Sequence, residues 1–155
     1  MGKVNVSDLI ENYIKQLLQE DTQLDIQRSK IAEHFHCVPS QINYVIKTRF
    51  TISKGYRVES KRGGGGYIRI TKIYIQPHKD RLESLSDSLN ETISFEEERN
   101  VIEQLLEWNC MTQREADLIL AMTSPNILEE TMSNQRARSK MMKKCLERLS
   151  YEIKE

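Results

Sequence analysis

Residues 31–70 read IAEHFHCVPSQINYVIKTRFTISKGYRVESKRGGGGYIRI and contain the most informative pattern in the chain. Its apolar spacing predicts a helix over residues 29–36 with one face in a core. Pro39 ends that helix, because proline disfavours a helical conformation in the residue before it. Ser40 is expected to cap a second helix that runs to about residue 50. Two short helices joined by a turn of about three or four residues form the helix-turn-helix pattern.

The second of these helices has two different faces when its residues are placed 100° apart. Ile42, Val45 and Ile46 lie on an apolar face. Amides, hydroxyls and a lysine cover the other face, and such groups suit base edges and phosphates in a major groove. These side chains are Gln41, Asn43, Tyr44, Lys47 and Thr48, with Arg49 near the border. A solvated helix face would look the same, so the helix alone leaves both interpretations open.

A basic hairpin is expected directly after this helix. Residues 55–60 and 67–73 are β-branched and aromatic runs with a period of two, and KRGGGG (61–66) joins them. A helix-turn-helix followed by such a hairpin is the winged helix-turn-helix arrangement. Glycines let backbone approach a sugar-phosphate wall closely, and an arginine at the tip can enter a narrow minor groove.

The remaining segments complete a two-domain prediction. Ser7 is expected to cap an N-terminal helix that runs to about Gln19, and residues 24–26 are a candidate short strand. SFEE (94–97) and TQRE (112–115) match the capping box that opens helices. Apolar periodicity predicts four helices near residues 80–90, 95–108, 112–123 and 134–149. The predicted architecture is an α+β N-terminal winged helix-turn-helix domain (1–74), a linker (75–79) and an all-α helical-bundle dimerisation domain (80–155). The bundle's core would be thin, which favours a homodimer.

Charge divides the chain in the same way. The 155 residues hold 23 Lys plus Arg and 23 Asp plus Glu, so the formal net charge is zero. Residues 1–72 nevertheless carry a net charge of +5, of which residues 40–72 alone give +7, and residues 73–155 carry −5. Such asymmetry indicates a polyanion-binding half joined to an acidic half that stays off DNA.

Other kinds of site are not indicated. Gly63–Gly66 lack the Gly-Lys-Ser/Thr end of a phosphate-binding loop, and His34, His36 and Cys37 lack a second ligand pair for zinc. We therefore expect no enzyme activity, no cofactor and no metal. Cys110 and Cys145 are expected to be small apolar core residues. Neither a signal-peptide stretch nor a run of ~20 apolar residues occurs, so we expect a cytoplasmic protein without membrane contact.

The first half of the chain also resembles a known family. CVPSQINYVI (37–46), TRF (48–50), GY (55–56) and VESKRGGGGYIRI (58–70) closely resemble the CtsR family, the class III stress gene repressors of low-G+C Gram-positive bacteria. Weaker similarity continues through REA (114–116), RAR (136–138) and MMK (141–143), whereas SPN (124–126) departs from the family's pattern.

The resemblance implies a cytoplasmic, homodimeric repressor of heat-shock genes that encode Clp chaperone and protease components. It implies operators made of direct heptanucleotide repeats in double-stranded DNA, with the helix over 40–50 in the major groove and Arg62 in the minor groove. An arginine kinase with its activator would be the regulatory partner, with Arg62 as a phosphorylation candidate. The Clp ATPase and protease machinery would degrade the released repressor. The DNA-binding candidates are Arg28, Ser40, Gln41, Asn43, Tyr44, Lys47, Thr48, Arg49, Lys61, Arg62, Gly63, Gly64, Gly65 and Gly66.

Gly63, Gly64, Gly65 and Gly66 would also be the heat-sensing element. Ordering a glycine costs about 0.5–1 kcal/mol more than ordering an alanine, so this tip adds about 2–4 kcal/mol to the cost of binding. That entropic cost grows only slowly with temperature, so local unfolding must add to it. Two alternatives remain: a winged-helix protein-interaction scaffold without specific DNA binding, and an enzyme with a cryptic site at the glycine loop.

Overall fold

The chain forms two compact units in a computed structural model that describes residues 5–62 and 66–154. The first unit runs to Ile75 and also takes in the residues from Glu152 onward, and the second is Gln76–Tyr151. The division differs in two ways from the expected domain limits. The expected linker over 75–79 contains the last residue of one strand and the first residue of a helix, and residues 152–154 group with the first unit.

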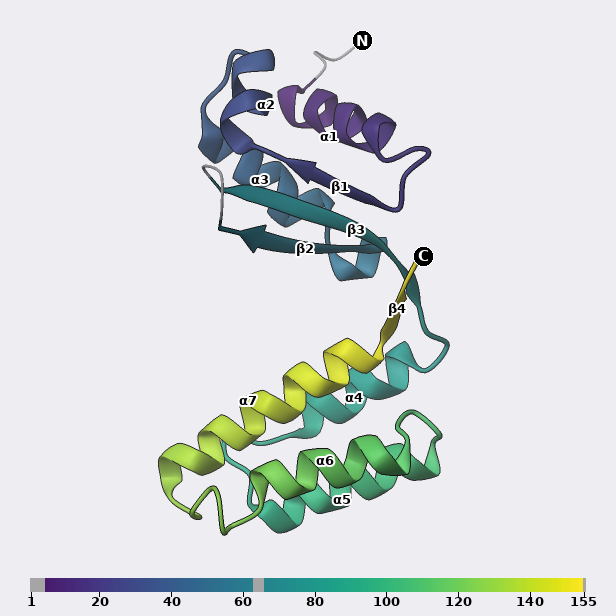
Figure 1. Ribbon diagram of the computed structural model, residues 1–155, viewed down its shortest axis with the longest axis vertical. Coiled ribbons are helices and arrows are strands. Elements are labelled where there is room, and N and C mark those ends of the chain that lie inside the picture. The colour runs from purple at the N-terminus through teal and green to yellow at the C-terminus, as the bar shows by residue number, and fades with distance from the viewer. Residues whose placement is uncertain (1–4, 63–65, 155) are drawn as a thin grey trace. The chain divides into compact units, whose positions relative to one another are not determined.

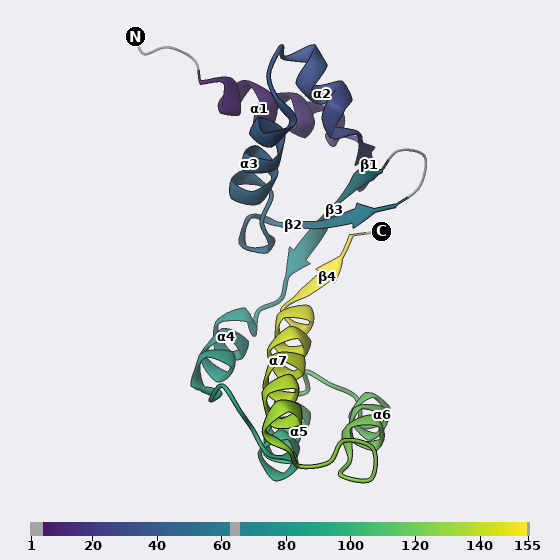
Figure 2. The same cartoon turned by 90° about the vertical axis from the view of Figure 1, so that its left-hand side faces the viewer.

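The first unit consists of three helices and an antiparallel sheet (Figures 1 and 2). Strand β3 is central, with β1 on one side and β2 on the other. In the antiparallel register, Gln23 of β1 lies opposite Thr71, and Lys61 of β2 lies opposite Tyr67. The elements are α1 (Val6–Leu17), β1 (Gln23–Ile26), α2 (Arg28–His34), α3 (Pro39–Arg49), the 3-10 turn η1 (Ile52–Lys54), β2 (Tyr56–Lys61) and β3 (Tyr67–Ile75). This is the predicted winged helix-turn-helix order.

One apolar core holds the three helices against the sheet. Ile10 and Ile14 of α1, Ile42 of α3 and Ile68 and Ile70 of β3 are all fully buried in it. Each fully buried isoleucine stabilises the fold by about 1.5–3 kcal/mol. The exposed face of α3 therefore has a fixed orientation relative to the hairpin.

Two predicted helix caps were wrong by two residues each. Asn5, not Ser7, caps α1: its side chain accepts a hydrogen bond from the Ser7 N–H at 2.8 Å. Helix α3 begins at Pro39 after an extended Val38, so Ser40 lies inside its first turn. Proline fits that first helical position because its missing N–H would have no partner there.

The second unit is a bundle of four helices. Helix α7 (Met132–Leu149) contacts both α4 (Lys79–Ser88) and α5 (Phe95–Glu107), and α5 contacts α6 (Gln113–Thr123). Ser94 and Thr112 accept hydrogen bonds as the predicted N-caps of α5 and α6, and Thr112 forms the complete capping box with Glu115. None of the helices in residues 5–62 and 66–154 has both the length and the apolar character to cross a bilayer.

A strand was missed at the end of the chain. Residues Tyr151–Ile153 form β4, which pairs with β3, and the Lys154 N–H donates to the Lys72 carbonyl at 3.1 Å. Strands β1 and β2 pair with β3 only as far as Lys72, and β4 pairs with β3 from that residue on. A three-residue segment is too short for a period-two pattern to reveal it.

Candidate nucleic-acid interface

The turn between α2 and α3 is held by backbone hydrogen bonds. The Cys37 N–H donates to the Ala32 carbonyl at 2.9 Å, and the His36 N–H donates to the Glu33 carbonyl at 3.2 Å. These are the two bonds of a Schellman motif, which needs a left-handed residue, and His36 fills that position with φ 52°. Backbone hydrogen bonds thus cap the C-terminus of α2, and α3 begins at Pro39.

Helix α3 turns its polar face to solvent as the sequence predicts. Ile42, Val45 and Ile46 are buried, whereas five polar candidates are exposed, with Tyr44 at 55%. The exposed candidates are Ser40, Asn43, Tyr44, Lys47 and Thr48. They offer hydroxyl, amide and ammonium groups along one helix face, which are the groups that bind base edges and phosphates.

Two other candidates on α3 bind α1 instead of facing solvent. Gln41 donates from Nε2 to Ser7 Oγ at 2.8 Å. The Arg49 guanidinium donates to Asp8 at 2.8 Å and to Glu11 at 2.5 Å. The hydrogen bonds that Arg49 donates to Asp8 and then to Glu11 raise the pKa of Arg49. Both side chains would have to leave α1 to contact a ligand.

Arg28 links three elements at the other side of α3. It is the first residue of α2, its Nε donates to Oδ1 of Asn43, and its Nη2 donates to Ser60 Oγ on β2 at 3.3 Å. The structure therefore brings two predicted site residues, Arg28 and Asn43, into direct contact. Ser60 was not predicted, because only the fold brings β2 next to α2.

The hairpin of β2 and β3, called the wing below, ends in the basic tip. Arg62 is exposed, and its side chain forms no ion pair with a residue in the described part of the chain. Gly66 has φ 81°, a left-handed conformation that glycine adopts without strain. Three of the four glycines predicted to sense heat or to form a cryptic site, Gly63, Gly64 and Gly65, lie outside the described residues.

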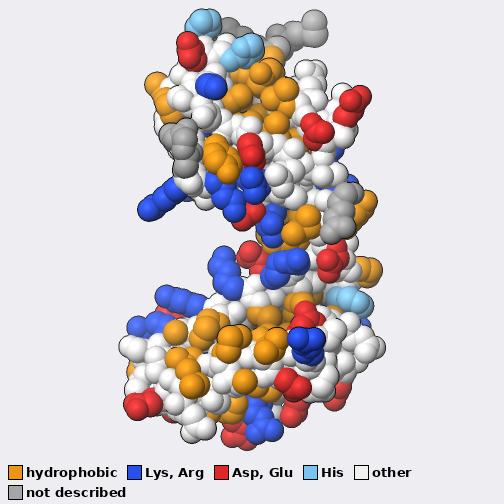
Figure 3. All heavy atoms as spheres, viewed as in Figure 1, with side chains coloured by type: hydrophobic (Ala, Val, Ile, Leu, Met, Phe, Trp, Pro, Cys, Tyr) orange, Lys and Arg blue, Asp and Glu red, His pale blue; other side chains and the backbone are white. Residues whose placement is uncertain are grey.

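Much of the predicted positive charge on the sheet is neutralised locally. Arg69 pairs with Asp25 at 3.0 Å, and Glu59 pairs with Arg57 and with Lys61, each at 3.1 Å. The hydrogen bond from Lys61 is the largest cause that lowers the pKa of Glu59. Figure 3 shows basic and acidic side chains interleaved over the strands of the first unit. The exposed basic groups outside these pairs include Lys47, Lys54 and Arg62.

The histidines and cysteines considered as possible metal ligands or core residues have structural roles in the fold. The His34 ring stacks on Tyr13 with centroids 4.9 Å apart, and His36 is the turn residue described above. Within residues 5–62 and 66–154, no group of three His, Cys, Asp or Glu side chains is arranged to hold a metal ion. Cys110 and Cys145 are half-buried against the core of the second unit, and burial raises the pKa of both thiols.

Comparisons with known proteins cover both units. Residues 5–74 match the family model of the CtsR N-terminal HTH domain, and residues 77–147 match that of the CtsR C-terminal dimerization domain. A transcriptional regulator CtsR of Geobacillus stearothermophilus is 43% identical over 150 residues, covering 95% of this chain and 98% of the relative. A CtsR of Lactiplantibacillus plantarum is 49% identical over 120 residues, covering 77% of each chain.

Two further matches also cover most of this chain. A transcriptional regulator CtsR of Staphylococcus aureus is 43% identical over 150 residues, covering 95% of this chain and 98% of the relative. A crystal structure of CtsR in complex with a 26bp DNA duplex has 42% sequence identity and a TM-score of 0.46. It covers 96% of this chain and 100% of that chain.

Proposed function

This chain belongs to the CtsR family of transcriptional regulators, and from that premise we propose that it is a dimeric repressor that binds operator DNA sequence-specifically. The observation that carries the proposal is the exposed polar face of α3, which is the second helix of the helix-turn-helix and lies beside the wing. We call α3 the recognition helix below. In this proposal Asn43, Tyr44 and Lys47 contact the major groove, because they are exposed.

The wing would supply a second contact. Arg62 is exposed at its tip and would enter the minor groove beside the glycines that follow it. Phosphorylation of Arg62 by an arginine kinase would replace a cation with a group that DNA phosphates repel, and thereby release the repressor. These roles are supported by the resemblance of the VESKRGGGGYIRI segment to the family and by the exposure of Arg62.

The regulated genes follow from the same resemblance. We infer that they encode Clp chaperone and protease components, that heat weakens DNA binding through Gly63–Gly66, and that the Clp machinery degrades the released protein in the cytoplasm. A footprint of the purified protein on the DNA upstream of its own gene, at two temperatures, tests the operator and the release together. Protection of direct heptanucleotide repeats that fades on heating supports the proposal. Protection that is equal at both temperatures would overturn the heat-release part.

The Arg62→Ala variant tests the wing contact. The loss of a minor-groove contact should weaken binding to the protected sequence by about 1–3 kcal/mol and binding to random DNA by much less, with dimerisation unchanged. Fluorescence anisotropy on both duplexes measures the two affinities. An equal loss on random DNA would mean that Arg62 is only a phosphate anchor.

The apolar surface of the second unit supports the proposed homodimer. Leu118 and Met122 lie one turn apart on α6 and are 56% and 62% exposed, and Ile127 and Met132 are 66% exposed. Figure 3 shows hydrophobic side chains gathered over α6 and its border with α7. Such a patch on a small bundle is typical of a protein–protein contact. We propose that a second copy covers this patch, in accord with the dimerization-domain match.

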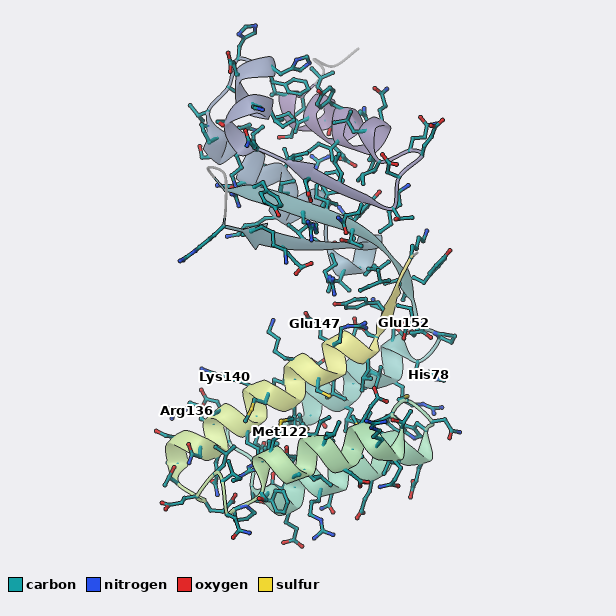
Figure 4. The ribbon with its side chains drawn as sticks, viewed as in Figure 1. His78, Met122, Arg136, Lys140, Glu147 and Glu152 are labelled. Carbon is teal, nitrogen blue, oxygen red and sulfur yellow. The ribbon has the colours of Figure 1, made fainter. Side chains whose placement is uncertain are left out.

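A pair of variants tests this dimer surface. Met122→Lys places a charge in the patch and should shift the protein toward monomer, as measured by analytical ultracentrifugation. The control is Lys140→Glu on α7, which should leave the dimer intact. Met122 lies on the side of α6 nearer α7, whereas Arg136 and Lys140 lie along the edge of α7 away from α6 (Figure 4). A Met122→Lys protein that remains dimeric would exclude this surface.

The scaffold alternative makes a different prediction about salt. DNA binding that releases counterions weakens steeply as salt rises, whereas a neutral protein contact does not. The ion pairs of Arg49, Arg57 and Arg69 leave fewer cations for DNA than the +7 of residues 40–72 indicates. We therefore expect a modest salt slope, and a slope of zero would favour the scaffold.

A further inference from the structure

Arg28 bonds to both parts of the first unit that the proposed function places in DNA grooves. Its Nε donates to the side chain of Asn43 on the recognition helix. Its Nη2 donates to Ser60 of β2, two residues before Arg62 in the wing. Ser60 stands opposite Ile68 in the β2–β3 register, on the same sheet face as Ile26. That face carries the core against which the helices pack, so Ser60 and Asn43 can share one guanidinium.

The contact with Arg28 fixes the orientation of the Asn43 amide. A guanidinium has donors and no acceptor, so the atom that faces it must be the amide oxygen. The Nδ2 group, which has two donors, is therefore turned away from Arg28. An unconstrained asparagine reads adenine by accepting and donating at once. An asparagine whose oxygen already accepts from Arg28 presents chiefly its donor, which suits an acceptor such as N7 of either purine, O6 of guanine or O4 of thymine, and so favours guanine over adenine.

We propose that Arg28 is a positioning residue that holds Asn43 so that it reads a hydrogen-bond acceptor in the major groove, and that joins the recognition helix to the wing through Ser60. The inference rests on the proposed function, since it concerns how operator DNA is read. It gives Arg28 a role in base preference through the two N–H donors that are bound within the protein. A plain phosphate anchor would instead affect all DNA sequences alike.

Selection from a pool of duplexes with a randomised central segment tests the proposal. The probe is that pool, the protein is the full chain, and sequencing of the bound DNA gives the base preference at each position. Asn43→Ala identifies the position that Asn43 reads. Arg28→Ala should lose the preference at the same position by about tenfold or more, and the double variant should lose little beyond either single variant.

Two control variants separate positioning from charge. Arg28→Lys keeps the charge but lacks the planar fork, so it should keep the salt slope and still lose the preference at the Asn43 position. Lys30→Ala removes an exposed charge from the same helix and should weaken binding to all sequences, lower the salt slope by about one and keep the preferences. Circular dichroism and the thermal midpoint establish that each variant is folded.

Each outcome decides one claim. An Arg28→Ala protein that is folded and keeps the unaltered preference at the Asn43 position, with a uniform loss of affinity, overturns the positioning role and makes Arg28 a phosphate anchor. Preference for adenine over guanine at that position in the unaltered protein overturns the orientation assigned to the amide, because N7 is common to both purines and only a free amide oxygen can accept from N6 of adenine. Selection of no sequence by the unaltered protein overturns the proposed function and the inference together.

Discussion

At the scale of single residues, the contact between α1 and α3 depends on Glu11. Its carboxylate accepts from Lys15 at 2.6 Å and from Arg49 at 2.5 Å, and its side chain is only 17% exposed. The hydrogen bond from Lys15 and then that from Arg49 lower the pKa of Glu11. The folded protein therefore binds a proton at Glu11 less readily than the unfolded chain does.

The lowered pKa of Glu11 predicts an acid-sensitive contribution to stability. This contribution is complete above the ordinary pKa of glutamate and is lost as the pH falls through the lowered value of the folded protein. Glu11→Gln should reduce the free energy of unfolding at neutral pH by a few tenths to about 1 kcal/mol and flatten its decline toward acid. Urea unfolding across a pH series measures both effects. Glu20→Gln, at an exposed position, is the control, and a Glu11→Gln profile parallel to the unaltered one would contradict the prediction.

At the scale of elements, helix α6 has the most complete start in the second unit. Thr112 Oγ1 accepts from the Glu115 N–H at 3.1 Å, and the Glu115 carboxylate accepts from the Thr112 N–H at 2.8 Å. Helix α6 also carries the proposed dimer residues Leu118 and Met122. Fraying of the first turn of α6 would therefore disturb the helix that carries the proposed dimer surface.

Thr112→Ala should lower the free energy of unfolding by about 1 kcal/mol. The Glu115 N–H then loses the hydroxyl that accepts its hydrogen bond, and the capping box is no longer complete. Thermal unfolding measures the loss, at a fixed protein concentration because dimerisation itself contributes. Thr112→Ser keeps the hydroxyl and should retain most of the stability. If serine and alanine are equally destabilising, the threonine methyl group and not the cap is responsible.

At the scale of the whole molecule, assembly of the second unit depends on a buried charge network. Arg138 of α7 and Glu98 of α5 are both fully buried and pair at 2.7 Å. Arg138 also donates to the Thr123 carbonyl at the end of α6 at 2.7 Å and to Glu130 at 2.8 Å, and its guanidinium carbon lies 5.3 Å from the centre of the Phe95 ring. One side chain thus joins three helices.

Removal of one partner from this network should be strongly destabilising. Arg138→Met leaves Glu98 buried without its counter-ion and should cost about 3–5 kcal/mol. The Arg138→Met/Glu98→Met double variant should cost less than the sum of the single changes, because neither charge is then left unpaired. Urea unfolding of the two single variants and the double variant forms the cycle. Additive effects would show that the two side chains are not energetically coupled.

The charge distribution of the whole chain is finer than two opposite halves. The expected acidic half is acidic over α4, α5 and α6, but α7 carries six basic residues and one acidic residue. The basic half, in turn, neutralises Arg49, Arg57 and Arg69 within its own fold. The +7 of residues 40–72 therefore overstates the positive charge available to DNA, because Arg49 and Arg69 pair with acidic residues outside that segment, and the −5 of the second half contains one basic helix.

The helix-turn-helix, the wing and the four later helices could all be predicted from the amino-acid sequence. Local patterns encode these features: the spacing of Ile42, Val45 and Ile46 defines the buried face of α3, the alternation around Ile68 and Ile70 defines a strand, and Thr112 with Glu115 marks a helix start. The polar face of α3 follows from the same periodicity, which is why Asn43, Tyr44 and Lys47 are exposed as expected.

Which polar side chains bind other residues of the protein could not be predicted from the sequence, because it depends on tertiary packing. Arg49 and Lys47 are both DNA-binding candidates on the same helix, yet Arg49 is bound to Asp8 and Glu11 and Lys47 is exposed. Arg28, Asn43 and Ser60 are far apart along the chain, and their contact exists because packing of α2 and α3 on the sheet brings them together. Local periodicity reports which face of an element is buried. The partner of a charged side chain depends on long-range packing, which no local pattern contains.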